Sequence, residues 1–285
     1  GKETRNIVMA NYSNDFSIEN LEVIRRYQSN EDNVFFAYSE FSYNTLVGAY
    51  EPFLDIICNM HRHFIGGSFD DFQKECGVYY LHRQVLNSYY ETGECFREET
   101  VLLNEVAYEQ RRMTKAIVDM LKRLSEVRPL MIVINRFQMA SKSSIETIKY
   151  LIDNPCTNIG IVLGVNVQVK GTDSTVEVWD RIVESLEDRS AIYYIGSAGQ
   201  QKNHIRDTSD DELYITTNFE QSIQEASNIM EFLDYEQARR GCRIIEHKIK
   251  FEDAWIDEKS LRRFYLIYAR TSVLLGEMSK AIELN

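Results

Sequence analysis

The sequence predicts an α/β fold in which a mostly parallel sheet of about five strands, arranged in three layers with its helices, is followed by an all-α region. Short apolar runs alternate with longer amphipathic segments through the first two-thirds of the 285-residue chain, which is typical of helices that cover a parallel sheet. Beyond residue 213 the apolar residues recur at a helical period, and they do so to the end of the chain.

Five short apolar runs are the candidate strands, and six longer amphipathic segments are the best candidate helices. The predicted strands are Asn6–Ala10, Val34–Tyr38, Leu130–Ile134, Ile159–Val165 and Ala191–Ile195. The predicted helices are Ile18–Tyr27, Phe53–Phe64, Val78–Tyr90, Glu98–Ser125, Ser144–Ile152 and Val176–Leu186. In the longest of these helices the apolar side chains form a broad stripe, which we expect to face the core.

A polar segment divides the chain into two parts. Residues 196–212 read GSAGQQKNHIRDTSDDE, a run rich in turn-forming residues and poor in large apolar ones, which indicates an exposed linker. We therefore expect an α/β domain over residues 1–196, a linker over 197–213 and a helical domain over 214–285.

Composition and charge argue against several classes of function. The net charge is −12, so the chain lacks the basic surface that general nucleic-acid binding requires. No apolar segment approaches the roughly 18 residues of a membrane span, and we find no signal peptide. The five cysteines are scattered and never form a C-x-x-C pair, which favours reduced thiols. We expect a cytoplasmic protein that contacts neither membrane nor nucleic acid directly.

The strand predicted at residues 130–134 ends where an ATPase places its metal-binding carboxylates. Two neighbouring acids at that edge would hold the Mg²⁺ of ATP and polarise the attacking water. This chain has Asn135 and Arg136 there. A neutral amide is a weak metal ligand, and a guanidinium brings positive charge to the place of the cation. The strand therefore has the outline of an NTPase site without its metal-binding groups.

The segment after the first predicted strand stands where NTPases have their phosphate-binding loop. A working loop reads G-x-x-x-x-G-K-[ST], and its backbone N–H groups surround the phosphates. In the same register this chain has Asn11, Phe16, Ser17 and Ile18. Phe16 replaces a glycine that lets the backbone approach phosphate, Ser17 replaces the lysine, and Ile18 has no hydroxyl for Mg²⁺. Because phosphoryl transfer depends on positioning and electrostatics, we expect no enzyme activity, cofactor or metal.

The ordered set of motifs resembles the AAA-like ATPase module of STAND-class bacterial signalling proteins, including large regulators of the LuxR type. That group typically reads an apolar strand, then D-D-L-H-W-A-D-x-x-S, then a helix. Here the segment is N-R-F-Q-M-A-S-K-S-S followed by IETIKYLID, in which Asn135, Arg136 and Ser141 replace the three acids. Residues 50–53 (YEPF) also match the Y-x-P-F element that follows the family's second strand.

The resemblance spans residues 6–195 and implies a degenerate P-loop-NTPase-like domain. Its departures fall on the catalytic positions, so the family's ATPase activity is not carried over. Asn166 follows the next predicted strand, near where a polar or basic sensor residue is usual. The family's architecture implies a bacterial signalling or transcription-regulatory protein whose output domain lies elsewhere. An α/β fold of another lineage is the alternative.

Two segments of the helical region match each other at a fixed offset. Ala226 precedes Ala238 as Ala269 precedes Ala281, and the second pair follows the first by 43 residues. Small residues at these places let antiparallel helices approach closely, and the next repeat stacks on the pair. The pattern resembles the long TPR-like repeats that follow the ATPase module in LuxR-type regulators. A plain helical bundle is the alternative.

The repeats predict a surface for a protein partner or a neighbouring domain. Two repeats are too few for independent stability, and the chain ends inside a helical pattern at Asn285, so we expect a truncated array. The leading hypothesis is therefore a non-catalytic regulatory and protein-interaction module.

The rival hypothesis is a residual nucleotide site or weak NTPase. Arg136 would hold phosphate in place of the metal, next to Asn135. Three residues of the preceding turn, Ser13, Asn14 and Ser17, would donate hydrogen bonds. A third possibility is a helical adaptor joined to an unrelated α/β domain, in which no such turn faces the strand end.

A metal site at Cys58, His61 and His63 is not expected. On a helix these residues are offset by three and five positions and do not converge on one face, and no fourth ligand follows.

Overall fold

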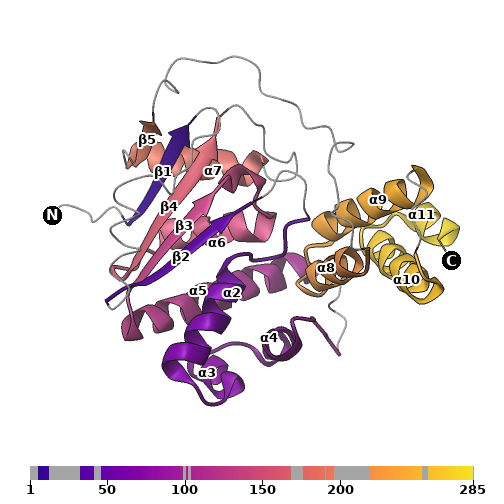
Figure 1. Cartoon of the computed structure of the whole chain (residues 1–285), viewed down its shortest axis with the longest axis horizontal. Helices are drawn as coiled ribbons and strands as arrows, with labels where there is room; N and C mark the ends of the chain where they lie inside the picture. Colours follow the sequence, from indigo (N-terminus) through magenta and orange to yellow (C-terminus); the bar gives the residue numbers. More distant parts are fainter. Residues whose placement is uncertain are drawn as a thin grey trace.

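Five parallel strands form one sheet in the first part of the protein (Figure 1). The computed structural model describes residues 6–12, 33–41, 46–98, 101, 104–167, 176–189, 191–195, 219–251 and 256–284. The strands are β1 (Ile7–Tyr12), β2 (Phe35–Glu40), β3 (Leu130–Asn135), β4 (Ile159–Asn166) and β5 (Ile192–Ile195). Every neighbouring pair is parallel, which confirms the predicted α/β class.

The strand order is β2-β3-β4-β1-β5, so the first strand lies inside the sheet. The chain runs from β1 to the far edge at β2, returns through β3 and β4, and then crosses β1 to reach β5. In an open parallel sheet, ligands bind beyond the carboxyl ends of the strands, where the direction of connection reverses. Here that place is the boundary between β4 and β1.

The two faces of the sheet carry two separate apolar clusters. The larger cluster contains alternate strand residues such as Ile132, Ile134 and Leu163, together with buried residues of three long helices. These helices are α5 (Val106–Val127), α6 (Lys142–Asp153) and α7 (Val176–Asp188), and each is a neighbour of the next. Met131 and Val133 belong to a smaller cluster on the opposite face. The helix predicted at residues 18–27 lies outside the described residues, and with it the third layer.

Shorter helices continue the α/β part beyond β2. They are α2 (Phe53–Met60), a π-helical turn (His61–Ile65), α3 (Phe69–Glu75) and α4 (Tyr80–Thr92). The sequence analysis missed α3, although it has a clear start signal. The Oγ atom of Ser68 accepts a hydrogen bond from the N–H of Asp71 at 3.2 Å, as a helix N-cap does.

The long helix α5 begins at Val106 and not at Glu98, so the prediction was wrong at this end. The preceding segment instead contacts the C-terminal helices. The N–H of Cys95 donates to Oδ1 of Asn228 at 2.8 Å, and Arg97 donates to the carbonyl of Glu231 at 3.1 Å. These tertiary contacts outweigh the helical tendency of the local sequence.

The C-terminal part consists of two helix pairs with the same turn. The helices are α8 (Phe219–Glu231), α9 (Tyr235–Phe251), α10 (Glu258–Leu274) and α11 (Met278–Glu283). Each turn has one residue with positive φ, Leu233 at 68° and Gly276 at 78°, and these residues are 43 positions apart. The N–H that follows bonds to the carbonyl five residues earlier, at 3.2 Å for Asp234 and 2.8 Å for Glu277. The two pairs therefore match at the predicted offset.

The four repeat alanines lie in the contacts between helices. Ala226, Ala238, Ala269 and Ala281 are all buried.

Among the described residues, no helix is both long and apolar enough to cross a bilayer.

The first helix pair docks on the α/β part through a continuous apolar cluster (Figure 1). The ring of Tyr50 meets that of Phe232 edge-on, with centroids 5.7 Å apart. A Cβ atom at Gly241 would lie 2.7 Å from Cδ2 of Leu46, so glycine at this position lets α9 pack against the Leu46 side chain. The side chain of Gln110 donates to the carbonyl of Leu233 at 2.7 Å.

Candidate functional site

Polar residues end four neighbouring strands at the carboxyl edge of the sheet. Tyr12 ends β1, Glu40 ends β2, Asn135 ends β3 and Asn166 ends β4. Because all the strands are parallel, these residues gather at one edge, where ligands of such sheets bind. The fold therefore places Asn135 where the sequence analysis expects the degenerate metal position.

The Asn135 side chain is engaged by the protein itself. Its Oδ1 atom accepts hydrogen bonds from the hydroxyl of Tyr12 at 2.7 Å and from the N–H of Arg136 at 3.0 Å. Asn135 is 3% exposed and Tyr12 is 2% exposed. An unpaired buried amide oxygen costs about 1–3 kcal/mol, so these bonds hold the group in place. The oxygen that would face a metal ion therefore has two protein donors.

Arg136 directs its charge toward β2. Its NH2 atom lies 3.1 Å from Oε1 of Glu40, and both side chains are about one-third exposed. β2 lies on the side of β3 away from β1, so this ion pair draws the guanidinium away from the β1–β4 boundary. Arg136 also has φ of 54°, a left-handed conformation that costs a non-glycine residue roughly 1–2 kcal/mol.

The turn after β3 is fastened to the end of β4. The side chain of Gln138 donates to the carbonyl of Asn166 and accepts from its N–H, each at 3.4 Å. Gln138 and Asn166 are both nearly buried. Asn166, the predicted sensor position, thus takes part in a structural contact through its backbone.

Ser141, which replaces the third acid of the resembled pattern, caps α6. Its Oγ accepts from the N–H of Ser144 at 3.4 Å. The neighbouring hydroxyls hold the YEPF turn: Oγ of Ser143 accepts from the N–H of Tyr50 at 3.0 Å, and Oγ of Ser144 donates to the carbonyl of Glu51 at 2.7 Å. These serines therefore connect the start of α6 to the turn that precedes α2.

Most of the predicted phosphate-loop positions lie outside the described residues, namely Ser13, Asn14, Phe16, Ser17 and Ile18. Asn11, the first of the predicted loop positions, belongs to β1 and is 9% exposed.

An acidic cleft of about 500 Å³ lies between the end of β2 and α8. Four of the residues that line it are Glu40, Glu51, Asp55 and Glu225. Burial raises the pKa of Glu51 and of Glu225 above the usual value for glutamate. This cleft next to the carboxyl edge disfavours anionic ligands such as phosphates.

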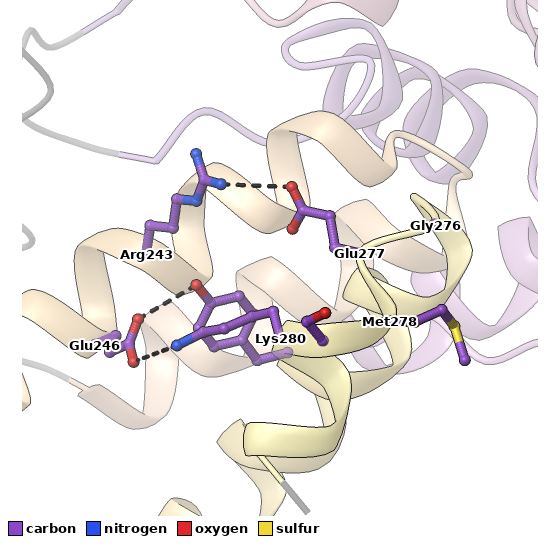
Figure 2. Close-up of a pocket in the computed structure, with 8 residues that line it drawn as sticks. Arg243, Glu246, Gly276, Glu277, Met278 and Lys280 are labelled. Atoms are coloured by element: carbon purple, nitrogen blue, oxygen red, sulfur yellow. Dashed lines mark hydrogen bonds and ion pairs between the residues drawn. The ribbon is translucent and has the colours of Figure 1, made fainter.

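A second groove, of about 650 Å³, lies where α9, α10 and α11 meet (Figure 2). Its charged side chains face one another: Arg243 lies 3.5 Å from Glu277, and Lys280 lies 3.0 Å from Glu246. The hydroxyl of Tyr268 donates to Glu246 at 3.2 Å. These pairs link the second helix pair to the first, so the groove is the polar rim of an internal contact.

A buried histidine–carboxylate pair was not predicted. Nε2 of His82 lies 2.8 Å from Oε2 of Glu109, whose other oxygen lies 3.0 Å from Arg112. Burial lowers the pKa of His82 to about 4, so the imidazole is neutral at pH 7. The pair joins α4 to α5, and the His82 side chain is fully buried, which suits a structural role. No motif could have found it, because the partners lie on different helices.

The cysteine–histidine segment, which spans the end of α2 and the π-helical turn, has local partners. Nδ1 of His61 lies 3.1 Å from the hydroxyl of Tyr90, and Nδ1 of His63 donates to the carbonyl of Asn59 at 2.7 Å. Within the described ranges, no three histidine, cysteine or acidic side chains gather as metal ligands. All five cysteines are unbridged thiols.

The chain was compared with known families and proteins. No protein-family model matches it, and no curated protein matches it.

Proposed function

We propose that this protein is a non-catalytic regulatory and protein-interaction module, a pseudo-ATPase built on a STAND-type, P-loop-NTPase-like scaffold. It would belong to a cytoplasmic bacterial signalling or transcription-regulatory protein. One observation carries the proposal: Oδ1 of Asn135, at the strand end where a metal-binding carboxylate is needed, is buried and bonded to Tyr12 and Arg136.

Electrostatics support the loss of catalysis. Phosphoryl transfer needs a metal ion and cationic groups around the phosphates. Loss of a single stabilising donor typically costs on the order of 3 kcal/mol in the transition state. Here the metal-binding carboxylate is a buried amide, and the adjacent guanidinium pairs with Glu40 at 3.1 Å. Several such losses together leave too little transition-state stabilisation for turnover.

The surroundings also weigh against a residual nucleotide site. That rival hypothesis needs Arg136 to hold phosphate, but Arg136 pairs with Glu40, on the strand away from β1. The cleft beside Glu40 is acidic and would repel a triphosphate.

The helical part supports the interaction role. Two helix pairs carry the same turn 43 residues apart, and their alanines pack between helices, as in stacked TPR-like repeats. Such repeats present extended surfaces to partners, so we assign partner binding to this part.

Thermal unfolding with MgATP, paired with a phosphate-release assay, tests the proposal. A ligand at 100 times its Kd stabilises a protein by about 2.7 kcal/mol, so about 5 mM MgATP would reveal a Kd near 50 µM. We expect no shift in Tm and no released phosphate. An Asn135→Asp variant, which restores one acid, should also fail to bind. A magnesium-dependent rise in Tm of the wild-type protein together with hydrolysis would refute the proposal.

A further inference from the structure

Four apolar side chains are exposed on the outer face of the second helix pair. On α10, Leu266 is 68% exposed and Val273 is 42% exposed; on α11, Met278 is 55% exposed and Ile282 is 73% exposed. The two residues of each helix are seven or four positions apart, so each pair lies on one side of its helix. We call these four residues the outer face.

The internal repeat shows what this face is built for. Three of its residues have counterparts 43 positions earlier that are buried apolar residues of the first helix pair. The counterparts of Leu266, Val273 and Met278 are Ile223, Met230 and Tyr235, with exposures of 1%, 4% and 8%. The same positions are therefore covered in the first pair and open in the second.

The helix that follows packs against the first helix pair. α10 packs against both α8 and α9. Two arginines of α10 reach α8, since Arg263 donates to Gln224 and Arg270 lies 2.9 Å from Glu231. The outer face thus repeats a helix-binding surface whose first copy is occupied by a helix of this chain.

Charge indicates the kind of helix that would bind. α10 carries four basic residues and one acidic residue in a chain whose net charge is −12. Its basic residues are Lys259, Arg262, Arg263 and Arg270. A second copy of this chain would bring two basic helices together, which like-charge repulsion disfavours. An acidic helix would gain from the same charges.

We propose that the outer face binds an acidic amphipathic α-helix of a protein partner. The apolar stripe of that helix would cover Leu266, Val273 and Ile282, and its carboxylates would face Lys259 and Arg262. The other two basic residues of α10, Arg263 and Arg270, contact α8. This is the recognition mode in which a helix lays its apolar face on a hydrophobic surface. The inference deepens the proposed interaction role, but it does not depend on the state of the strand edge.

A peptide derived from α10 itself provides the probe. It carries the sequence of residues 258–274 with the four basic residues replaced by glutamate, and a fluorescent label for anisotropy titration. We expect saturable binding with a Kd of about 100 µM or tighter, weakened by added salt. The unmodified basic peptide is the matched control and should bind at least tenfold more weakly.

Two protein variants locate the binding surface. Leu266→Glu combined with Ile282→Glu should weaken binding of the acidic peptide at least tenfold, while circular dichroism shows an unchanged fold because both side chains are exposed. Phe251→Glu is the control, since Phe251 is 73% exposed on α9 and outside the outer face.

Three outcomes would overturn the inference. They are no binding to the wild-type protein, equal binding to both variants, or a wild-type dimer in sedimentation that the double variant dissociates. The last would identify a second copy as the occupant. Nucleotide binding at the strand edge would refute the proposed pseudo-ATPase and leave this result unaffected.

Discussion

The carboxyl edge of the sheet and the outer face of the second helix pair differ in how far their side chains are buried and partnered. At the edge, Asn135 and Tyr12 are buried and bonded to each other at 2.7 Å. On the outer face, Leu266 and Ile282 expose most of their apolar surface to water. Binding gains free energy when it buries apolar surface that is exposed to water in the free protein. The contrast supports the proposal that the helices carry the interaction function and that the strand edge has a structural role.

The largest expected effect compares one repeat position in its covered and open forms. Ile223→Ala removes a side chain that is 1% exposed and should lower the free energy of unfolding by about 2–5 kcal/mol. Leu266→Ala, at the equivalent position and 68% exposed, should change it by about 0.5 kcal/mol or less. Guanidinium unfolding measures both. Equal losses would show that Leu266 is as well covered as Ile223 and would remove the argument for an open binding surface.

The next-largest expected effect is a pH dependence of stability that the first helix turn should show and the second should not. Burial raises the pKa of Asp234 to about 6, against about 3.9 in an unfolded chain. The folded state therefore binds this proton more tightly, and the stability it contributes is full below about pH 4 and lost as pH rises through about 6. Asp234→Asn keeps the oxygen that accepts from the N–H of Gln237 at 3.3 Å. We expect the variant to exceed the wild type by on the order of 2 kcal/mol at pH 7.5.

Urea unfolding from pH 4 to pH 8 measures that difference, which should vanish toward pH 4. The equivalent residue in the second turn provides the control. Glu277 pairs with Arg243 at 3.5 Å near the surface, so Glu277→Gln should lower stability by at most about 1 kcal/mol. An Asp234→Asn difference that stayed constant with pH would contradict the assigned burial of the carboxylate.

The smallest effect concerns the strand edge. Tyr12→Phe removes one of the two donors to Oδ1 of Asn135 and should cost about 1 kcal/mol. Tyr38→Phe is the matched control, because its hydroxyl donates to Glu40 at 3.0 Å in an exposed place, and it should cost less. Denaturant midpoints at constant slope measure both changes. A Tyr12→Phe variant as stable as the wild type would mean that the hydroxyl does not hold Asn135.

Much of the α/β part could be predicted because buried parallel strands are continuous apolar runs. All five predicted strands lie within two residues of the observed ends. The start of α5 could not be predicted, because Cys95 and Arg97 ahead of it bond to Asn228 and Glu231, which are distant in sequence. The 43-residue repeat offset could be predicted because the buried alanines of the two helix pairs recur at that spacing.

The candidate site was predicted by position but not by contacts. The end of an apolar strand located Asn135 and Arg136 at the sheet edge, since strand ends are visible in the sequence. The partners of these residues could not be predicted, because Tyr12 is 123 positions from Asn135 and Glu40 lies at the end of a different strand. Strand order alone brings these side chains together, and no local pattern encodes it.

Isothermal titration calorimetry of the wild-type protein with MgATP shows whether the strand edge still holds a nucleotide. We expect only heats of dilution up to about 1 mM nucleotide, which corresponds to a binding free energy weaker than about 4 kcal/mol. A saturable isotherm with a micromolar Kd that disappears when magnesium is chelated would contradict this expectation.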